Sequence, residues 1–141
     1  MISTRGRYAI RVMIDLAEHR NGAYIPMKEI AERQNISLKY MEKIMPVLSK
    51  EHLVDGLHGK GGGYRLCREP DAYTVGEILR LTEGDLAPVA CLAANADPCD
   101  RAGECRTLPM WKKYYDLTNA YFDGITIADL MKNAAPHDYI I

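Results

Sequence analysis

A run of glycines near the middle of the chain restricts the local structure to a tight β-hairpin. Residues 54–65 read VDGLHGKGGGYR, with apolar residues on both sides of the glycines. Glycine is favoured where the backbone takes a positive φ or approaches another surface closely. A phosphate-binding loop ends in Gly-Lys-Ser/Thr and opens a helix, whereas Gly63 precedes Tyr-Arg-Leu, which opens a strand. The sequence predicts a thin cationic hairpin, which is either an ordinary exposed turn or an element that enters a nucleic-acid groove.

The segment before the hairpin predicts two helices. Apolar residues recur at three- and four-residue spacing across residues 3–20, which indicates one amphipathic helix. Pro26 suits the first turn of a second helix over residues 27–34, because the missing N–H would lack a partner there in any case. Gln34 and Asn35 then break the pattern.

Ser37 is a good N-cap for a third helix, over residues 37–51. Pro46 is expected to bend this helix or to tighten its last part. A short connection between two helices, followed by a hairpin, indicates a winged helix-turn-helix, in which the second helix of the pair reads base edges in the major groove. The apolar stripe of this third helix is expected to consist of Leu38, Met41, Ile44 and Leu48.

Polar residues at the start of this third helix favour DNA as the ligand. Hydroxyl and amine groups can donate hydrogen bonds there, and a glutamate can accept one from a cytosine amino group. An exposed, solvated polar face is the alternative for each residue taken alone. The candidate DNA contacts are Arg5 in the first helix, then Ser37, Lys39, Tyr40, Glu42 and Lys43, and His58, Lys60 and Gly61 in the hairpin.

The charge distribution supports this interpretation. Residues 1–68 carry 12 Lys and Arg against 7 Asp and Glu, a net charge of +5, whereas residues 69–141 carry 6 against 12, a net charge of −6. A basic half beside an acidic half fits a polyanion-binding module joined to a part that does not bind the polyanion. No apolar run reaches the roughly 20 residues of a membrane span, and no signal peptide is recognised, so we expect a cytoplasmic protein.

The acidic half predicts a short helix, a loop and a long helix. Thr74 to Glu77 match a capping box, and the helix it opens ends at Gly84. A long helix from Pro109 to Gly124 carries a broad aromatic stripe, which we interpret as a dimerisation surface. The expected organisation is a DNA-binding domain over 1–84, a cysteine-bearing loop over 85–107, dimerisation helices over 108–133 and a flexible tail over 134–141.

Three cysteines of the aperiodic loop, Cys91, Cys99 and Cys105, are spaced C-x7-C-x5-C. This is not the CxxC pattern of a zinc ribbon, and wide spacing in one loop suits an iron–sulfur cluster. A thiol redox switch, a zinc site and no site at all remain alternatives. Cys67, at the end of the hairpin, is expected to be a small buried apolar residue. No Cys–His pair is suggested, so we expect no enzyme activity and no small-molecule substrate.

The chain resembles the Rrf family of dimeric winged-helix transcriptional regulators. The resemblance rests on ISTRGRYAIRVMIDLA, IAERQNISLKYMEKIMPVLSKEHLV, the wing GKGGGY, the TVGEI helix and the three-cysteine loop before a Trp-bearing helix. Within the family, the IscR-type regulators of iron–sulfur cluster assembly match best, and sister members sense nitric oxide or regulate cysteine metabolism. The match covers about residues 1–132 in one order.

The resemblance implies a mainly helical fold with a small β-hairpin wing and a long dimerisation helix. It implies a homodimeric repressor on palindromic operator DNA, with the helix from Ser37 in the major groove and the wing at the minor groove. It implies an iron–sulfur cluster on Cys91, Cys99 and Cys105, of the [2Fe–2S] type or, alternatively, the [4Fe–4S] type. Iron–sulfur cluster biogenesis genes are the implied targets; control of cysteine or sulfur metabolism without a cluster is the alternative.

The sequence departs from the family pattern at the expected fourth ligand. The IscR type has a histidine three residues after the third cysteine, where this chain has Leu108, and the nitric-oxide-sensing type has an acidic residue where this chain has Arg7 and Tyr8. The fourth ligand is therefore either a residue of a partner subunit or one of the nearby carboxylates. His58 also replaces an arginine of the IscR-type wing. The carboxylate candidates are Asp97, Asp100 and Glu104.

Overall fold

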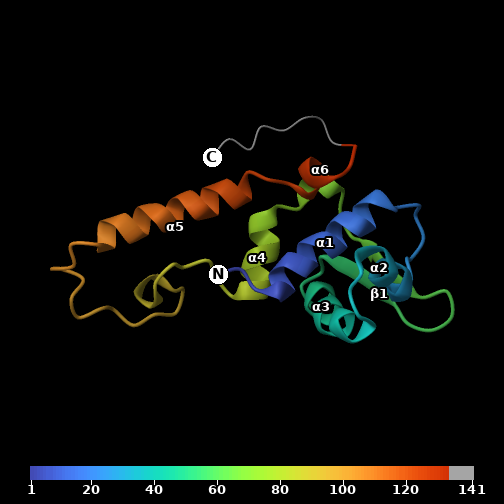
Figure 1. Ribbon diagram of the computed structural model, residues 1–141, viewed down its shortest axis with the longest axis horizontal. Coiled ribbons are helices and arrows are strands. Elements are labelled where there is room, and N and C mark those ends of the chain that lie inside the picture. Colours follow the sequence, from blue (N-terminus) through green and yellow to red (C-terminus); the bar gives the residue numbers. More distant parts are fainter. Residues whose placement is uncertain (134–141) are drawn as a thin grey trace.

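A computed structural model describes residues 1–133 of the chain. It is mainly helical with one two-stranded antiparallel hairpin, which confirms the predicted fold class (Figure 1). The hairpin lies beside the N-terminal helices, and the loop before α5 projects from the opposite end (Figure 1). The predicted tail, 134–141, lies outside the described residues. The elements are α1 (Thr4–Glu18), α2 (Met27–Gln34), α3 (Leu38–Lys50), β1 (Val54–Leu57), β2 (Gly63–Leu66), α4 (Val75–Glu83), α5 (Leu108–Asp123) and α6 (Ile127–Leu130), with 3₁₀ turns at Pro70–Ala72 and Ala90–Leu92.

Helix α1 lies at the centre of the N-terminal module and packs against α2, α3, α4 and α6. Its N-cap is Ser3, whose hydroxyl accepts a hydrogen bond from the Gly6 N–H. The apolar stripe predicted from the sequence is buried, because its residues recur on one face of the helix. Val12, Met13 and Leu16 are fully buried in the main core.

A buried carboxylate joins α2 to α1. Asp15 of α1 has no exposed surface, and it accepts hydrogen bonds from Arg33 Nε at 3.0 Å, Arg33 Nη2 at 2.8 Å and Gln34 Nε2 at 3.0 Å. Both partners lie in the last turn of α2. A buried charge is tolerated when it is paired and hydrogen-bonded, so this contact fixes where α2 ends relative to α1.

Helix α3 differs from the sequence prediction in the composition of its apolar stripe. Leu38 was expected in the apolar stripe but is 45% exposed, and the fully buried Met45 takes its place in the core. The reason is that Leu38 occupies the first helical turn, which extends beyond the edge of the core. Pro46 lies on the exposed face, and the helix continues past it to Lys50.

The hairpin pairs Val54 with Leu66 and Leu57 with Gly63. Position 63 requires glycine for the hairpin to pack against Ile25. Its φ is +153°, and a Cβ there would lie 2.2 Å from the Ile25 carbonyl oxygen. This close approach allows Ile25 and Tyr64 to exchange two backbone hydrogen bonds of 2.8 Å. The hairpin is therefore attached to the segment that leads into α2, while its tip extends past the helices (Figure 1).

A buried tyrosine hydroxyl joins the base of the hairpin. Tyr73 is fully buried, and its hydroxyl donates to the Leu53 carbonyl at 2.7 Å. The same oxygen accepts from the N–H groups of Cys67 at 2.9 Å and Arg68 at 3.0 Å. Leu53 precedes β1 and Cys67 follows β2, so one side chain holds both ends of the wing. Burial raises the pKa of Tyr73, so the hydroxyl keeps its proton.

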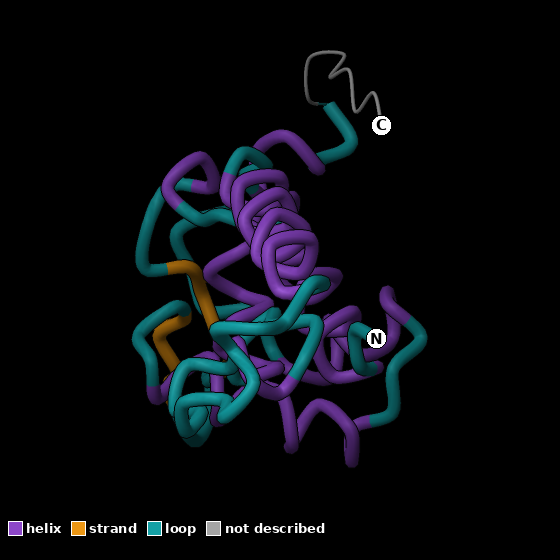
Figure 2. Tube along the Cα trace, turned by 90° about the vertical axis from the view of Figure 1, so that its left-hand side faces the viewer, coloured by secondary structure: helices purple, strands orange, loops and turns teal. Residues whose placement is uncertain are grey.

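Helix α5 connects to the rest of the molecule through α4. Arg80 of α4 donates to Asp123 at 2.5 Å and to Asn119 at 3.1 Å. Figure 2 looks nearly along the axis of α5, with the loop before it in front. In the part of the chain that the structure describes, no residue of α5 is buried, so part of this partly apolar helix remains exposed. Within residues 1–133, no helix is both long and apolar enough to cross a membrane.

We expect Tyr73→Phe to lower the free energy of unfolding by about 2 to 3 kcal/mol, because it leaves buried backbone groups of the wing without a partner. Urea denaturation measures the change. Tyr8→Phe is the matched control, since the Tyr8 ring packs on Tyr40 and the part of the chain described shows no hydrogen bond to its hydroxyl. We expect the control to change stability by about 0.5 kcal/mol or less. Equal losses in the two variants would contradict a special role for Tyr73.

Candidate DNA-binding face and cysteine pocket

The connection between α2 and α3 has the geometry of a tight helix-turn-helix. Asn35 takes a left-handed conformation with φ of +53°, which asparagine tolerates better than most residues. Ile36 is buried, and its N–H donates to the Ala31 carbonyl at 3.0 Å. Ser37 then caps α3 by accepting from the Tyr40 N–H at 3.1 Å, as the sequence predicts. The start of α3 is thus fixed by backbone and core contacts together.

The outer face of α3 carries most of the predicted base contacts. Lys39, Glu42 and Lys43 are exposed at helical spacing, opposite the buried Met41 and Ile44. The exposed face offers two ammonium donors and one carboxylate acceptor, the groups that read guanine and cytosine edges.

Tyr40 has a packing role in addition to its exposed edge. Its ring meets the Tyr8 ring edge-on with centroids 5.2 Å apart, and Lys43 Nζ lies 5.9 Å from the Tyr40 ring centroid. Arg11 covers the Tyr8 ring at 5.0 Å. Tyr40 therefore helps hold α3 against α1, which sequence reasoning did not anticipate.

An open pocket gathers three of the predicted contacts from different helices. Arg5 of α1 and Tyr40 and Lys43 of α3 line it, together with residues at the end of α4. Arg5 Nη2 donates to the Thr82 carbonyl at 2.8 Å, so one of its five donors is already used. Sequence reasoning missed the α4 residues, because their proximity to Arg5 depends on the tertiary fold. The lining residues are Ser3, Thr4, Arg5, Tyr40, Lys43, Thr82 and Glu83.

The wing tip presents its predicted contacts to solvent. His58, Lys60 and Gly61 are all exposed. Gly61 has φ of +76°, and the Gly62 N–H donates to the Gly59 carbonyl at 3.0 Å to close the loop. The tip is thin and has no bulky side chain between His58 and Lys60, which suits approach to a groove. Strand β1 packs against α3, so the wing and the outer face of α3 belong to one module.

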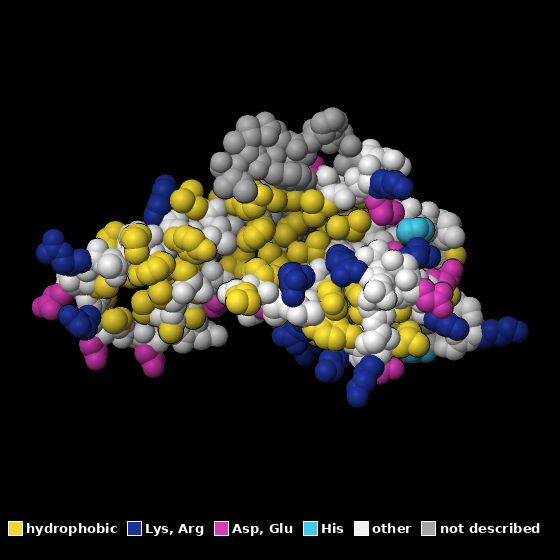
Figure 3. Space-filling view, in the orientation of Figure 1, with side chains coloured by type: hydrophobic (Ala, Val, Ile, Leu, Met, Phe, Trp, Pro, Cys, Tyr) yellow, Lys and Arg dark blue, Asp and Glu magenta, His cyan; other side chains and the backbone are white. Residues whose placement is uncertain are grey.

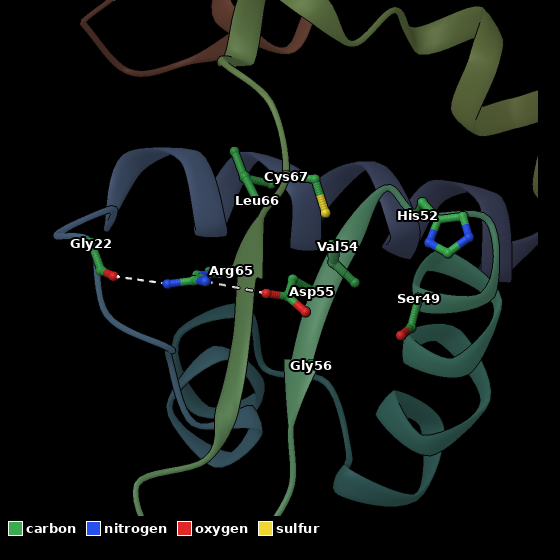
Figure 4. A pocket seen from close by; sticks show the side chains of 9 residues that line it. All are labelled: Gly22, Ser49, His52, Val54, Asp55, Gly56, Arg65, Leu66 and Cys67. Atoms are coloured by element: carbon green, nitrogen blue, oxygen red, sulfur yellow. Dashed lines mark hydrogen bonds and ion pairs between the residues drawn. The ribbon is translucent and has the colours of Figure 1, made fainter.

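The flank of the wing carries an ordered polar cluster. Arg65 donates to the Gly22 carbonyl at 3.3 Å and pairs with Asp55 at 3.3 Å (Figure 4). The Tyr24 hydroxyl donates to Asp55 at 2.8 Å, and the Arg65 guanidinium lies 4.3 Å from the Tyr24 ring centroid. The hydrogen bond to Asp55 raises the pKa of Tyr24. These contacts attach β1 and β2 to the segment between α1 and α2.

Cys67 lies beside this cluster and corrects one expectation. The sequence predicts a buried apolar residue, whereas Cys67 is exposed and lines an open pocket with His52 and Arg65 (Figure 4). The physical reason is that the paired hairpin ends at Leu66, so the chain leaves the core there. Partial desolvation nevertheless raises the pKa of the Cys67 thiol, which disfavours a reactive thiolate.

The three loop cysteines come together around one pocket. Cys91, Cys99 and Cys105 all line a pocket of about 220 Å³. The described residues include no three metal-binding side chains already arranged to hold one ion. The other lining residues are Leu92, Pro98, Ala102, Leu108 and Lys112.

The donors of this pocket fit a thiophilic group. A hydrogen bond from the Thr107 hydroxyl lowers the pKa of the Cys105 thiol, which favours the thiolate that binds metals. Thiolates in an apolar shell are the ligands that iron–sulfur clusters use. The three candidate carboxylates of the loop are not among the residues that line the pocket. Leu108 and Lys112 occupy one side of it, and a helical spacing of four could have indicated Lys112 from the sequence.

Helix α5 exposes an apolar stripe next to this pocket. Met110, Tyr114, Leu117 and Tyr121 are 53%, 55%, 57% and 43% exposed. Their spacing of four, three and four residues places them on one face of the helix. Hydrophobic side chains gather broadly over the region of α4 and α5 in Figure 3, and Lys and Arg project both around the N-terminal module and around the loop end of α5.

Comparisons with known proteins agree with this architecture. A family model described as "Rrf2: Iron-dependent Transcriptional regulator" matches residues 2–133. The HTH-type transcriptional regulator IscR of Aliivibrio salmonicida is 33% identical over 130 residues, which cover 92% of this chain and 76% of the relative. IscR of Yersinia pseudotuberculosis is 31% identical over 132 residues, 94% of this chain and 79% of the relative.

Solved structures show the same fold. The global cysteine regulator CymR of B. subtilis superposes with a TM-score of 0.75 at 34% identity, covering 96% of this chain and 98% of CymR. IscR of T. potens superposes with a TM-score of 0.73 at 34% identity, covering 99% of this chain and 94% of that IscR chain. Both relatives that lead the sequence comparison are named as transcriptional regulators and not as enzymes. The family match covers nearly all of the described residues, and the fold is a winged helix-turn-helix. This protein is therefore a transcriptional regulator that belongs to the Rrf2 family.

Proposed function

We propose that the protein is a homodimeric repressor whose binding to operator DNA is controlled by an iron–sulfur cluster on Cys91, Cys99 and Cys105. The observation that supports the proposal is that these three cysteines line one largely apolar pocket in a chain with an exposed winged helix-turn-helix. Residues 1–84 form the DNA-binding part, 85–107 the cluster loop and 108–133 the dimerisation part. The regulated genes are those of iron–sulfur cluster biogenesis.

The proposed DNA contacts divide between two grooves. The start of α3 enters the major groove, where Ser37, Lys39, Glu42 and Lys43 reach base edges and phosphates. The wing approaches the minor groove with His58, Lys60 and Gly61. Arg5 and Tyr40 contact the backbone beside α3. A palindromic operator follows from two copies of this module related by a two-fold axis.

The proposed cluster is of the [2Fe–2S] type, with [4Fe–4S] as the alternative. Three thiols of the pocket would hold it, and a bound cluster would supply an inorganic core that responds to oxidants. The Leu108 side chain has no atom that can bind iron, and the loop carboxylates do not line the pocket. We therefore assign the fourth ligand to a group that is not among the residues lining the pocket. A residue of the second subunit fits this role.

A thiol switch on the same cysteines is the second candidate. The favouring observation is that Cys105 is partly exposed with a lowered pKa, which promotes thiol oxidation. The structural relative CymR is described as a global cysteine regulator, and this chain could likewise act on cysteine metabolism without a cluster. The two candidates share DNA binding and differ in whether the protein carries iron.

The proposed dimer forms through α5. Its four exposed apolar residues are spaced as in a helix that packs on a partner helix, and within residues 1–133 about half of each side chain remains exposed. A second copy is the simplest cover for such a stripe. The two α3 helices of the dimer would then meet successive major grooves, about 34 Å apart.

We expect Cys105→Ser to reduce bound iron to background after anaerobic reconstitution with iron and sulfide. The reason is that the variant removes one of three converging thiolates. Metal analysis and visible absorption provide the measurement. Cys67→Ser is the matched control and should retain the iron of the wild type, because Cys67 lies at the wing. Colourless, iron-free wild-type protein would favour the thiol switch, and equal operator affinity with and without cluster would contradict cluster control.

We expect Lys60→Glu to weaken operator binding about tenfold or more at low salt and to make its salt dependence shallower, because it removes a phosphate contact and adds a repulsive charge. Fluorescence anisotropy on an operator duplex measures both. Lys132→Glu makes the same charge change at the end of α6, outside the proposed face, and should change affinity less. Unchanged operator affinity of Lys60→Glu would show that the wing is only a turn and does not contact DNA.

We expect Leu117→Glu to convert the dimer to a monomer at micromolar concentration, because it places a charge at the centre of the apolar stripe. Size-exclusion chromatography with light scattering measures the mass. Asp116→Lys changes the charge of an exposed residue of the same helix that is not three or four residues from any member of the stripe, and the dimer should persist. A dimeric Leu117→Glu protein would show that the interface lies elsewhere.

A further inference from the structure

An acidic side chain lies among the cations of the proposed DNA face. Glu83, the last residue of α4, lines the open pocket of about 560 Å³ shared with Arg5 and Lys43. Its Oε1 accepts hydrogen bonds from the Ser3 N–H at 2.9 Å and from the Ser3 hydroxyl at 2.6 Å. A carboxylate at this place opposes the approach of a polyanion, so its presence calls for a physical explanation.

The packing between α1 and α4 holds this carboxylate in place. Gly6 of α1 is buried, and a Cβ added there would lie 2.4 Å from Glu83 Oε1 and 3.1 Å from Thr82 Oγ1. The missing side chain therefore allows the end of α4 to approach the first turn of α1. Arg5 secures the same approach through its hydrogen bond to the Thr82 carbonyl. Several contacts thus determine the position of Glu83.

The groups around the carboxylate are those that bind phosphate. A backbone N–H, a hydroxyl, a guanidinium and an ammonium line one open pocket, and each type contacts phosphate oxygens in protein–DNA complexes. Glu83 presents an anionic oxygen to the first two of them. We propose that this pocket binds a backbone phosphate of the operator and that Glu83 is a built-in competitor that lowers the affinity of the site. The proposal rests on the DNA-binding function proposed above.

Charge decides the size of the effect. The pocket holds two cations and one anion, and Glu83→Gln removes the anion while it keeps an oxygen that can accept from Ser3. Because the pocket is open to water, the interaction of one charge with a nearby phosphate is modest, about threefold in affinity per site at low salt. Two sites in a dimer make this about tenfold. The gain shrinks as salt rises, because mobile ions screen an exposed charge.

The test compares operator affinities of wild type, Glu83→Gln and Glu83→Asp over a salt series. Glu83→Gln should bind about tenfold tighter at about 0.05 M salt and about equally at about 0.3 M, with a steeper dependence on salt. Glu83→Asp keeps the charge and should stay near wild type in its salt dependence. A Glu83 that only anchors α1 would instead give weaker or equal binding in Glu83→Gln and no change in salt dependence, which would overturn the proposal.

Two further variants keep the test decisive. Glu69→Gln removes an exposed carboxylate at the other end of α1, where Glu69 pairs with Arg20, and should change affinity by less than about twofold. Arg5→Gln removes one cation from each of the two sites and should weaken binding about tenfold at low salt and flatten the salt dependence. An unchanged salt dependence in Arg5→Gln would overturn the phosphate site even if Glu83→Gln failed to fold.

Failure of the proposed function and failure of this inference give different results. If the wild type binds no duplex, the proposed function fails. If the wild type binds and Glu83→Gln shows no gain in affinity, only the present inference fails.

Discussion

The arrangement of the proposed DNA-binding face depends on one buried carboxylate. Asp15 is surrounded by protein, and a charge in that position needs full compensation, which Arg33 and Gln34 provide. Both partners belong to the last turn of α2, so the helix must stop at a fixed place on α1. The left-handed Asn35 follows at once and directs the chain into α3. The orientation of α3 thus follows from an interaction two elements earlier, and loss of one partner of such a pair costs about 3 to 5 kcal/mol.

The wing is held by a second polar centre of a different kind. The Tyr73 hydroxyl is neutral and serves as donor and acceptor at once, so it can satisfy groups from both ends of the hairpin. Gly63 adds a close backbone approach to Ile25 that a side chain would prevent. Together these contacts fix the base of the wing and leave its tip, which includes Lys60, without packing partners. A fixed base with an adaptable tip suits a groove whose width varies with sequence.

Local patterns predicted the elements well, and long-range polar contacts escaped them. The cap at Ser37, the hairpin from the glycine run and the exposed lysines of α3 depend on residues close in sequence, which periodicity and propensity describe. Asp15 finds Arg33 and Gln34 18 and 19 residues away, and the Tyr73 hydroxyl donates to Leu53, 20 residues away, so no local signal marks these contacts. The prediction that Leu38 and Cys67 are buried was wrong for a related reason. Each lies at the end of an element, where the boundary of the core and not the local pattern decides burial.

The end of α4 joins the two candidate sites of the protein. Thr82 and Glu83 contact the first turn of α1 within the proposed DNA face. Two residues later, the Asp85 carboxylate accepts from the N–H groups of Ala87 at 3.0 Å and Ala94 at 3.1 Å, on either side of Cys91. A rearrangement of the cysteine loop that broke these bonds would act next to Glu83 through Gly84. Coupling between sites requires an element that both can bias, and this short segment contacts the first turn of α1 on one side and the backbone of the cysteine loop on the other.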